Sequence, residues 1–141
     1  MKPVLLDTGV VVALLDRSEG FHQRSVAAVE EIDRPLITCE AVIAESCYLL
    51  RGLEGAPEAV LENVARGVFL IPFQLSRSAP AVQGLLQKYR ELPIDVADAC
   101  LIQLANESGS DEILTLDRDF EVYRRGRNKP FRLLIPLGAT R

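Results

Sequence analysis

Short apolar runs alternate along this chain with longer stretches in which apolar residues recur at helical spacing. The short runs, which predict buried strands, cover residues 4–6, 36–38, 68–71, 112–116 and 131–135. Helical periodicity marks residues 21–32, 38–51, 60–65, 79–89 and 95–105, with Pro80 expected in the first turn of its helix. Strands that alternate with helices of this length indicate an α/β fold whose parallel sheet is covered on both faces.

Length and composition fit one compact domain over residues 1–141. The sequence has 141 residues, of which 48% are hydrophobic and 26% are charged. That length is enough to bury a substantial core without disulfides. The apolar run at residues 4–6 is too short for a signal peptide, and no later run reaches membrane-spanning length. We therefore expect a cytoplasmic protein without a membrane anchor.

The cysteines and the distribution of charge bear on whether the protein has disulfides, a zinc site or a surface for nucleic acid. Cys39, Cys47 and Cys100 are odd in number and have no Cys-x-x-Cys spacing, which favours buried free thiols over disulfides or a zinc site. The net charge of −4 argues against broad attraction to nucleic acid. Within residues 124–132, however, five of nine residues are basic. This segment could face phosphates, although a solvated loop is the commoner explanation.

The stretch at 95–105 is an almost entirely apolar helix that carries an acid. Asp95 suits its N-cap, and with about 3.6 residues per turn Asp98 shares the inward face with Leu101 and Ile102. Because a buried, unpaired carboxylate is costly, it is usually protonated, paired or bound to a metal. The structural alternative is a capping box, in which the Asp98 side chain folds back onto the first N–H groups of the helix.

Three further acids occupy positions that are expected to face inward. Asp7 and Asp117 follow predicted strands, at the edge of a parallel sheet where ligands bind. On its own helix, Glu45 shares a face with Ala41, Val42, Tyr48 and Leu49. Glu40 points away from that face. The alternative for Glu45 is a long side chain that extends to the surface.

Together, the four acids predict a bound cation. Like charges about 5 Å apart, at an effective dielectric constant of about 20, repel by roughly 3 kcal/mol per pair. A cluster of acids therefore persists only with protons or a cation present. Oxygen ligands select Mg²⁺ or Mn²⁺, and such an ion can activate water and neutralise the charge on a phosphodiester.

The ordered motifs around these acids resemble those of a known family. They are Leu5-Leu6-Asp7-Thr8, Ala44-Glu45, Asp98-Ala99 and Thr115-Leu116-Asp117 with Phe120. In order and spacing they resemble the motifs of PIN-domain ribonucleases, particularly the VapC-type toxins of bacterial toxin–antitoxin pairs, over nearly the whole chain. The resemblance implies a three-layer α/β/α fold with a short central parallel sheet, and an endoribonuclease that depends on Mg²⁺ or Mn²⁺.

The same resemblance implies roles for individual residues. The positions that match the family's catalytic and metal-binding cluster are Asp7, Glu45, Asp98 and Asp117. Thr115 matches a hydroxyl often found near that cluster, and Thr8 and Asp119 are further accessory candidates. We favour Asp117 over Asp119 as a ligand because Asp117 directly follows its predicted strand. Water, rather than the ribose 2′-hydroxyl, would attack phosphorus and leave 5′-phosphate and 3′-hydroxyl ends.

The implied partners are an RNA substrate, a cognate antitoxin and a second copy of this chain in a homodimer. An antitoxin is expected to place Arg or Lys near the acids, where a guanidinium can pair with a carboxylate. An acidic site also needs positive charge nearby to attract a polyanion. We expect the basic segment to help hold RNA through Arg124, Arg125, Arg127 and Lys129.

Three other interpretations compete with a nuclease. Asp7-Thr8-Gly9 matches the signature of aspartic proteases, but helical periodicity dominates this chain and no second such motif follows. A phosphoacceptor receiver domain is also α/β, yet it should carry an acid pair near its start and a late Lys at a strand end, and neither is evident. The third is a catalytically silent PIN-like module that binds RNA or protein without cutting.

Overall fold

A parallel sheet of five short strands forms the centre of the structure, a computed structural model that describes residues 2–92 and 94–138. Its strands are β1 (Val4–Leu6), β2 (Leu36–Ile37), β3 (Phe69–Leu70), β4 (Glu112–Leu114) and β7 (Arg132–Leu133), in the spatial order β3-β2-β1-β4-β7. All neighbouring strands are parallel. The central strand β1 is fully buried, which explains why it is wholly apolar.

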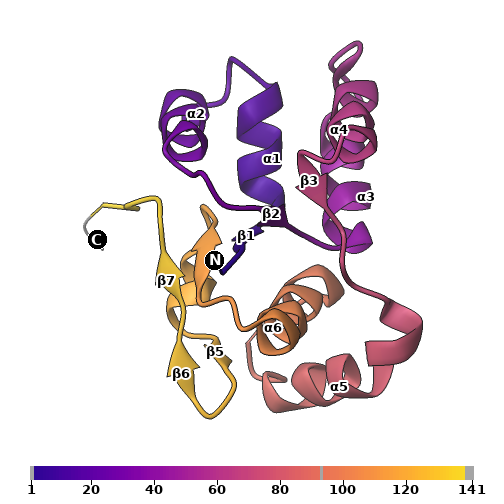
Figure 1. Ribbon diagram of the computed structural model, residues 1–141, viewed down its shortest axis with the longest axis vertical. Coiled ribbons are helices and arrows are strands. Elements are labelled where there is room, and N and C mark those ends of the chain that lie inside the picture. The colour runs from indigo at the N-terminus through magenta and orange to yellow at the C-terminus, as the bar shows by residue number, and fades with distance from the viewer. Residues whose placement is uncertain (1, 93, 139–141) are drawn as a thin grey trace.

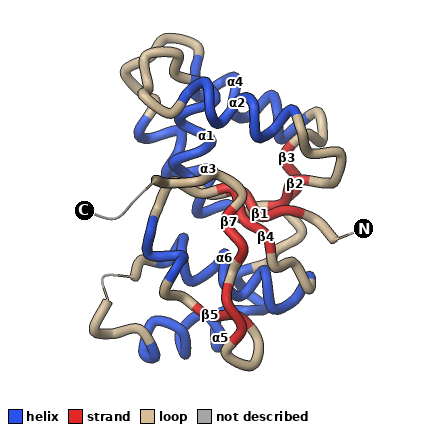
Figure 2. The backbone as a smooth tube through the Cα atoms, turned by 90° about the vertical axis from the view of Figure 1, so that its left-hand side faces the viewer, coloured by secondary structure: helices blue, strands red, loops and turns tan. Residues whose placement is uncertain are grey.

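Helices cover both faces of this sheet. They are α1 (Thr8–Leu15), α2 (His22–Glu30), α3 (Glu40–Leu49), α4 (Ala56–Ala65), α5 (Leu75–Lys88) and α6 (Val96–Ser108). Figure 1 shows α1 and α2 on one side of the strands and α5 and α6 on the other, and Figure 2 shows the same layers from the side. The predicted three-layer α/β/α fold with a parallel sheet is therefore confirmed. Within the described ranges, no helix is long and apolar enough to cross a membrane.

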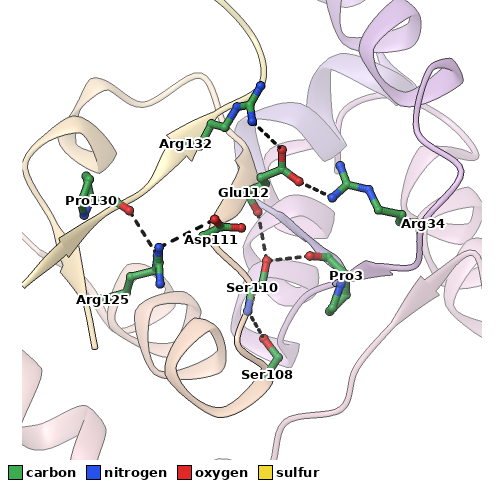
Figure 3. Close-up of polar contacts among 9 residues, drawn as sticks. All are labelled: Pro3, Arg34, Ser108, Ser110, Asp111, Glu112, Arg125, Pro130 and Arg132. Carbon is green, nitrogen blue, oxygen red and sulfur yellow. Dashed lines mark hydrogen bonds and ion pairs between the residues drawn. The ribbon is translucent and has the colours of Figure 1, made fainter. Parts of the chain in front are cut away.

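Polar contacts tie together the edge at which the strands begin (Figure 3). The hydroxyl of Ser110 donates to the carbonyl of Pro3 at 2.7 Å, which links the segment before β4 to the start of β1. Glu112, the first residue of β4, pairs with Arg34, which precedes β2, and with Arg132 of β7 at 3.7 Å. Side chains in the strands and in the segments just before them therefore link the strands at the amino edge of the sheet.

The limits of α5 differ from the prediction. Because α5 begins at Leu75, Pro80 lies inside the helix rather than in its first turn, and that prediction is wrong. The apolar stripe that predicted the helix starts at Ala79, but polar residues before it are already helical. One of them, the buried Ser78, donates its hydroxyl to Glu107 of α6. Helix α5 is thus longer than its apolar stripe predicts, and its additional first turn makes a polar contact with α6 that the stripe does not encode.

The basic segment forms a hairpin rather than a plain loop. Strand β5 (Arg124–Arg125) pairs antiparallel with β6 (Lys129–Pro130). In the turn between them, Gly126 and Asn128 adopt positive φ angles of 50° and 61°, which glycine and asparagine tolerate best. The N–H of Gly126 donates to Oδ1 of Asn106, near the C-terminal end of α6, at 2.6 Å. The hairpin therefore packs at that end of α6.

The three cysteines are free thiols, as predicted. Cys39 and Cys100 are buried and line a small cavity of about 50 Å³ between α3 and α6, whereas Cys47 is half-buried. They behave as small apolar residues of the core rather than as metal ligands or disulfide partners.

Candidate functional site

Asp7 sits where β1 ends and α1 begins. Its backbone N–H extends the sheet by donating to the carbonyl of Leu114 in β4, at 3.0 Å. Its side chain caps α1, with Oδ1 accepting from the N–H of Thr8 at 2.8 Å. The other oxygen, Oδ2, accepts from the hydroxyl of Thr115 at 2.6 Å. Asp7 is only 5% exposed, and each of its two carboxylate oxygens accepts a hydrogen bond from the protein.

Asp98 lies in the first turn of α6 and is buried, as predicted. Asp95 is the N-cap, and its Oδ1 accepts from the N–H of Asp98 at 2.8 Å. In residues 2–92 and 94–138 the reciprocal bond of a capping box is absent, since the Asp98 side chain accepts instead from the hydroxyl of Tyr123 at 3.4 Å. The capping-box alternative is therefore wrong for the Asp98 side chain.

Asp117 follows β4 less directly than the sequence predicted. The strand ends at Leu114, three residues earlier, because the chain then leaves the sheet. The buried hydroxyl of Thr115 accepts from the N–H of Asp117 at 3.0 Å. Asp117 in turn caps the short 3₁₀ helix η1 (Arg118–Glu121), accepting from the N–H of Asp119 at 2.8 Å. Thr115 therefore contacts both Asp7 and Asp117, which matches its expected place beside the cluster.

These three acids converge at the carboxyl edge of the sheet. One carboxylate oxygen from each of Asp7, Asp98 and Asp117 lies within 4.8 Å of the other two. Burial raises the pKa of Asp7 to about 6, although hydrogen bonds from Thr115 and Thr8 oppose the shift. Burial raises the pKa of Asp98 to about 8, with further contributions from neighbouring acids, of which Asp7 is the largest. Their negative charge is therefore costly in the absence of a cation.

Glu45 lines the same pocket but lies outside the group of three. The hydroxyl of Thr8 donates to its Oε1 at 2.7 Å, so Thr8 connects α1 to α3 at the site. The predicted inward face of α3 is partly wrong, because Tyr48 and Leu49 are 62% and 55% exposed. The buried side of the helix instead carries Val42, Ile43 and Ser46. Glu45 is half-buried at the boundary between these two sides, where it can reach the pocket.

The pocket has a volume of about 460 Å³ and includes residues that the sequence did not reveal. Glu19, from the loop between α1 and α2, adds another carboxylate, and Leu49 adds an apolar side chain. Arg118 adds positive charge, and it donates to the carbonyls of Leu137 and Gly138 at 2.9 and 2.6 Å. The one local signal for Arg118 was its place between two acids in the sequence.

Of the predicted accessory residues, Thr8 lines the pocket, whereas Thr115 lies behind Asp7 and neither Asp119 nor the basic hairpin lines it. Asp119 is not one of its lining residues, although its pKa is raised by burial and by the nearby charge of Asp117. The basic hairpin contacts α6 at Asn106, whereas Asp98 lies near the opposite end of that helix. Eight residues of α-helix correspond to about 12 Å. The hairpin thus lies at a distance from the acids, and contact with RNA there stays a prediction.

The donor set fits Mg²⁺ or Mn²⁺. The lining residues of the pocket offer carboxylate and hydroxyl oxygens and include no thiol or imidazole. Hard divalent cations prefer such oxygen ligands. The three carboxylate oxygens lie within 4.8 Å of one another, and ligands of one Mg²⁺ ion lie within about 4.2 Å of one another, so small side-chain movements would let the three acids share an ion. A bound ion would also offset the cost of burial, and the smaller repulsion between the acids, that raise the pKa values of Asp7 and Asp98.

Comparison with known proteins places this geometry in a family. The family model for the PIN domain matches residues 4–126. The chain belongs to the PIN domain family. Ribonuclease VapC26 of Mycobacterium tuberculosis is 27% identical over 140 residues, which cover 98% of this chain and 96% of that protein. The crystal structure of VapC20 from the same species, titled a Sarcin-Ricin loop cleaving toxin, superposes with a TM-score of 0.76 at 17% identity, over 84% of this chain and 93% of that one.

PIN-domain membership resolves two of the competing interpretations. The parallel sheet between helical layers is the architecture shared with VapC20, and it differs from the mostly β fold of aspartic proteases. The family match likewise replaces the receiver-domain interpretation, whose acid pair and late Lys the sequence lacks. The acids of this PIN domain therefore have to be interpreted as a nuclease site or as the remnant of one.

Proposed function

We propose that this PIN-domain protein is a metal-dependent endoribonuclease that hydrolyses phosphodiester bonds in RNA. The observation that carries the proposal is the convergence of Asp7, Asp98 and Asp117 from three separate parts of the chain. Two of these carboxyls are buried and have raised pKa values, so the arrangement costs folding free energy. A binding module without catalytic activity would gain nothing from that cost.

Asp7, Asp98 and Asp117 would hold the ion, with Glu45 at its side. When bound, Mg²⁺ or Mn²⁺ supplies positive charge that neutralises the phosphodiester and acidifies water. Asp7 is the most rigid of these acids, since each of its oxygens accepts a hydrogen bond. Thr8 fixes one oxygen of Glu45 and leaves the other for substrate or water. Such fixed ligands reduce the reorganisation that the reaction requires.

The names of the two relatives support a more specific role. VapC26 is named a ribonuclease and VapC20 is titled a toxin that cleaves the Sarcin-Ricin loop, and both match this chain over most of their length. We infer that this protein is likewise the toxin of a toxin–antitoxin pair. Its partners would be an RNA substrate, a cognate antitoxin and a second copy of the chain in a homodimer.

The test is cleavage of single-stranded RNA by purified protein with Mg²⁺, Mn²⁺ or EDTA. We expect cleavage with either ion, none with EDTA, and products with 5′-phosphate and 3′-hydroxyl ends. Asp117→Asn should abolish cleavage. The matched control is Asp111→Asn, which removes an acid at the opposite edge of the sheet, where Asp111 pairs with Arg125 at 3.8 Å.

The same experiment separates the nuclease from its alternatives. Binding of RNA without cleavage would support the catalytically silent module. Products with 2′,3′-cyclic ends would mean that the ribose hydroxyl attacks, and would contradict the role proposed for the acids. Cleavage that persists in EDTA would contradict metal dependence.

A further inference from the structure

Tyr123 is a buried aromatic residue whose polar end reaches the acidic site. It is 0% exposed and lies just after η1, where its backbone N–H donates to the carbonyl of Asp119 at 3.0 Å. Its ring makes edge contacts with Tyr89 and Phe120, at centroid distances of 5.2 and 5.1 Å. The ring is therefore locked in the core between α5, α6 and η1.

The Tyr123 hydroxyl has one hydrogen-bond partner among the described residues, and that partner is Oδ2 of Asp98 at 3.4 Å. A buried tyrosine hydroxyl normally bonds to a polar group, and a backbone carbonyl would serve as well. Here it bonds to an acid of the site. Within the same described ranges, no hydrogen bond reaches Oδ1 of Asp98, which leaves that oxygen available to a ligand.

Two other acids of the site, Asp7 and Glu45, are held in a related way, whereas Asp117 accepts from the backbone N–H of Asp119. The hydroxyl of Thr115 donates to Asp7, and the hydroxyl of Thr8 donates to Glu45. In each case a neutral O–H fixes one carboxylate oxygen without neutralising the charge of the acid. Tyr123 plays the equivalent part for Asp98.

We propose that Tyr123 is a positioning residue of the metal centre, whose hydroxyl orients Asp98 toward Asp7 and Asp117. This inference rests on the proposed function, because it assigns Tyr123 a part in binding the ion. The turn that begins at Asp117 makes the arrangement possible. Asp117 caps η1 at one end and Tyr123 follows η1 at the other, so one short segment supplies a carboxylate and the partner of a second carboxylate. Since Tyr123 is fully buried, it cannot touch RNA directly.

The test compares Tyr123→Phe with Tyr89→Phe. Both variants remove a hydroxyl from the same aromatic cluster and keep the rings. The Tyr89 hydroxyl, however, accepts from the backbone N–H of Arg124 at 2.8 Å, and within residues 2–92 and 94–138 it has no hydrogen bond to an acid. Loss of a group that orients a metal ligand typically weakens binding or activity about 10- to 100-fold. For Tyr123→Phe we expect Mn²⁺ affinity, measured by titration calorimetry with Mn²⁺ alone, to fall about tenfold.

Cleavage kinetics supply a second measurement. In Tyr123→Phe, kcat at fixed Mn²⁺ should fall while KM for RNA stays unchanged, because the hydroxyl is remote from the substrate. Tyr89→Phe should retain wild-type Mn²⁺ affinity and kcat. A double-mutant cycle of Tyr123→Phe with Asp98→Asn, followed by thermal unfolding in EDTA, should be non-additive if the two side chains interact.

Several outcomes would overturn the inference. Wild-type Mn²⁺ affinity and kcat in Tyr123→Phe, beside an active wild-type enzyme, would reduce Tyr123 to a core residue and leave the proposed function intact. Equal losses in Tyr89→Phe would point to general disturbance of the aromatic cluster. A Tyr123→Phe protein that fails to fold would also overturn it, since an orienting hydroxyl can be removed without loss of ring contacts. Wild-type protein that neither binds Mn²⁺ nor cuts RNA would overturn the proposed function, and the inference with it.

Discussion

Asp98 is the residue at which stability and function oppose each other most directly. It is 8% exposed, and burial together with the negative charges of Asp7, Asp95, Asp117 and Glu45 raises its pKa to about 8. Asp98→Asn removes a carboxyl that must either bind a proton or bury a charge when the metal-free protein folds, while Asp95 continues to cap α6. Near neutral pH we expect the variant to melt at a higher temperature than wild type in EDTA, to gain less stability from Mg²⁺, and to lose RNA cleavage.

Glu40→Gln is the control for this substitution. Glu40 is exposed in the first turn of α3, so its neutralisation should change stability by less than about 1 kcal/mol and leave cleavage intact. Thermal unfolding in EDTA and in Mg²⁺, beside a cleavage assay at the same protein concentration, compares the variants. An Asp98→Asn protein that is less stable in EDTA and still cuts RNA at the wild-type rate would remove Asp98 from the active site.

The raised pKa values also predict how the stability of the metal-free protein varies with pH. The pKa is about 6 for Asp7 and about 8 for Asp98 in the folded protein, against an ordinary value of 3.8. At pH values between the ordinary pKa and the raised one, each of these carboxyls is protonated in the folded protein and ionised in the unfolded chain. The contribution of both groups to stability is therefore fully present below about pH 4 and is lost as pH rises to about 8. Each tenfold difference in proton affinity between the folded and unfolded states contributes up to about 1.4 kcal/mol.

Urea unfolding of the metal-free protein at a series of pH values measures this effect. Other acids contribute their own dependence, so the informative quantity is the difference between wild type and Asp98→Asn. That difference should grow as pH rises from about 6 to about 8, where Asp98 ionises. Parallel curves for the two proteins would contradict a raised pKa at Asp98.

The acids could be predicted from sequence because each one interrupts an apolar context. Asp7 and Asp98 stand out in this way, and the structure brings both together with Asp117. Tyr123 and Arg118 could not be found by the same reasoning. An aromatic residue three positions after Phe120 indicates a core position, and only the fold shows where its hydroxyl points. Arg118 likewise becomes a pocket residue only through the turn that follows β4.

Among the elements, α3 shows the limit of a periodic pattern. The pattern placed Glu45 on one face with Tyr48 and Leu49, because all of these positions share a helical stripe. In the structure the apolar end of that stripe is exposed, and Leu49 lines the pocket instead of the core. A helix beside a pocket has a boundary between packed and open sides that hydrophobicity alone does not locate. Apolar content therefore predicted the existence of α3 better than its orientation.

The hairpin of β5 and β6 carries the prediction that was made for the basic segment. Arg124 donates to three backbone carbonyls and Arg125 pairs with Asp111, so both have structural contacts. Arg127 and Lys129 are exposed. If these two contact phosphates of single-stranded RNA, changing both to Ala should reduce the slope of log affinity against log salt by about 1.4.

This measurement is best made with the inactive Asp117→Asn protein, which keeps the RNA intact. Arg66→Ala, at the end of α4 and also exposed, is the control and should leave the slope unchanged. A slope that is the same with and without Arg127 and Lys129 would assign the hairpin to ordinary surface. The hairpin lies at the end of α6 opposite Asp98, so RNA would have to extend from the acids to that end of the helix to contact Arg127 and Lys129.

At the scale of the whole molecule, the two edges of the sheet are built differently. Ion pairs of Glu112 with Arg34 and Arg132 close the amino edge, whereas the carboxyl edge gathers acids that repel one another. A cation should therefore stabilise the entire fold. At a hundredfold excess over its dissociation constant, an ion specific to the native state adds about 2.7 kcal/mol, or roughly 5–10 °C in melting temperature for a chain of this size.

Thermal unfolding with EDTA, Mg²⁺ and Mn²⁺ measures this stabilisation. Ca²⁺ at the same ionic strength separates specific binding from general screening of charge, because a larger ion prefers more ligands. A melting temperature that is indifferent to millimolar Mg²⁺ and Mn²⁺ would count heavily against a metal site.

The clustering of acidic side chains in one pocket also predicts how an antitoxin would inhibit the protein. Carboxylates of Asp7, Glu19, Glu45, Asp95, Asp98 and Asp117 line one pocket. A guanidinium inserted there could pair bidentately with a carboxylate and replace the charge of the ion. Inhibitor and metal would then compete, and by linkage each should weaken the binding of the other by the same factor.

The prediction is that a cognate antitoxin inhibits less strongly as Mn²⁺ is raised, and that Arg→Ala changes in its inserted segment relieve inhibition. Arg→Lys changes should retain part of the effect, since Lys keeps the charge but not the bidentate geometry. Titration of cleavage against antitoxin at several Mn²⁺ concentrations measures both. The prediction is wrong if inhibition is independent of Mn²⁺ and survives replacement of every basic residue of that segment, because the antitoxin would then act on a surface away from the acids.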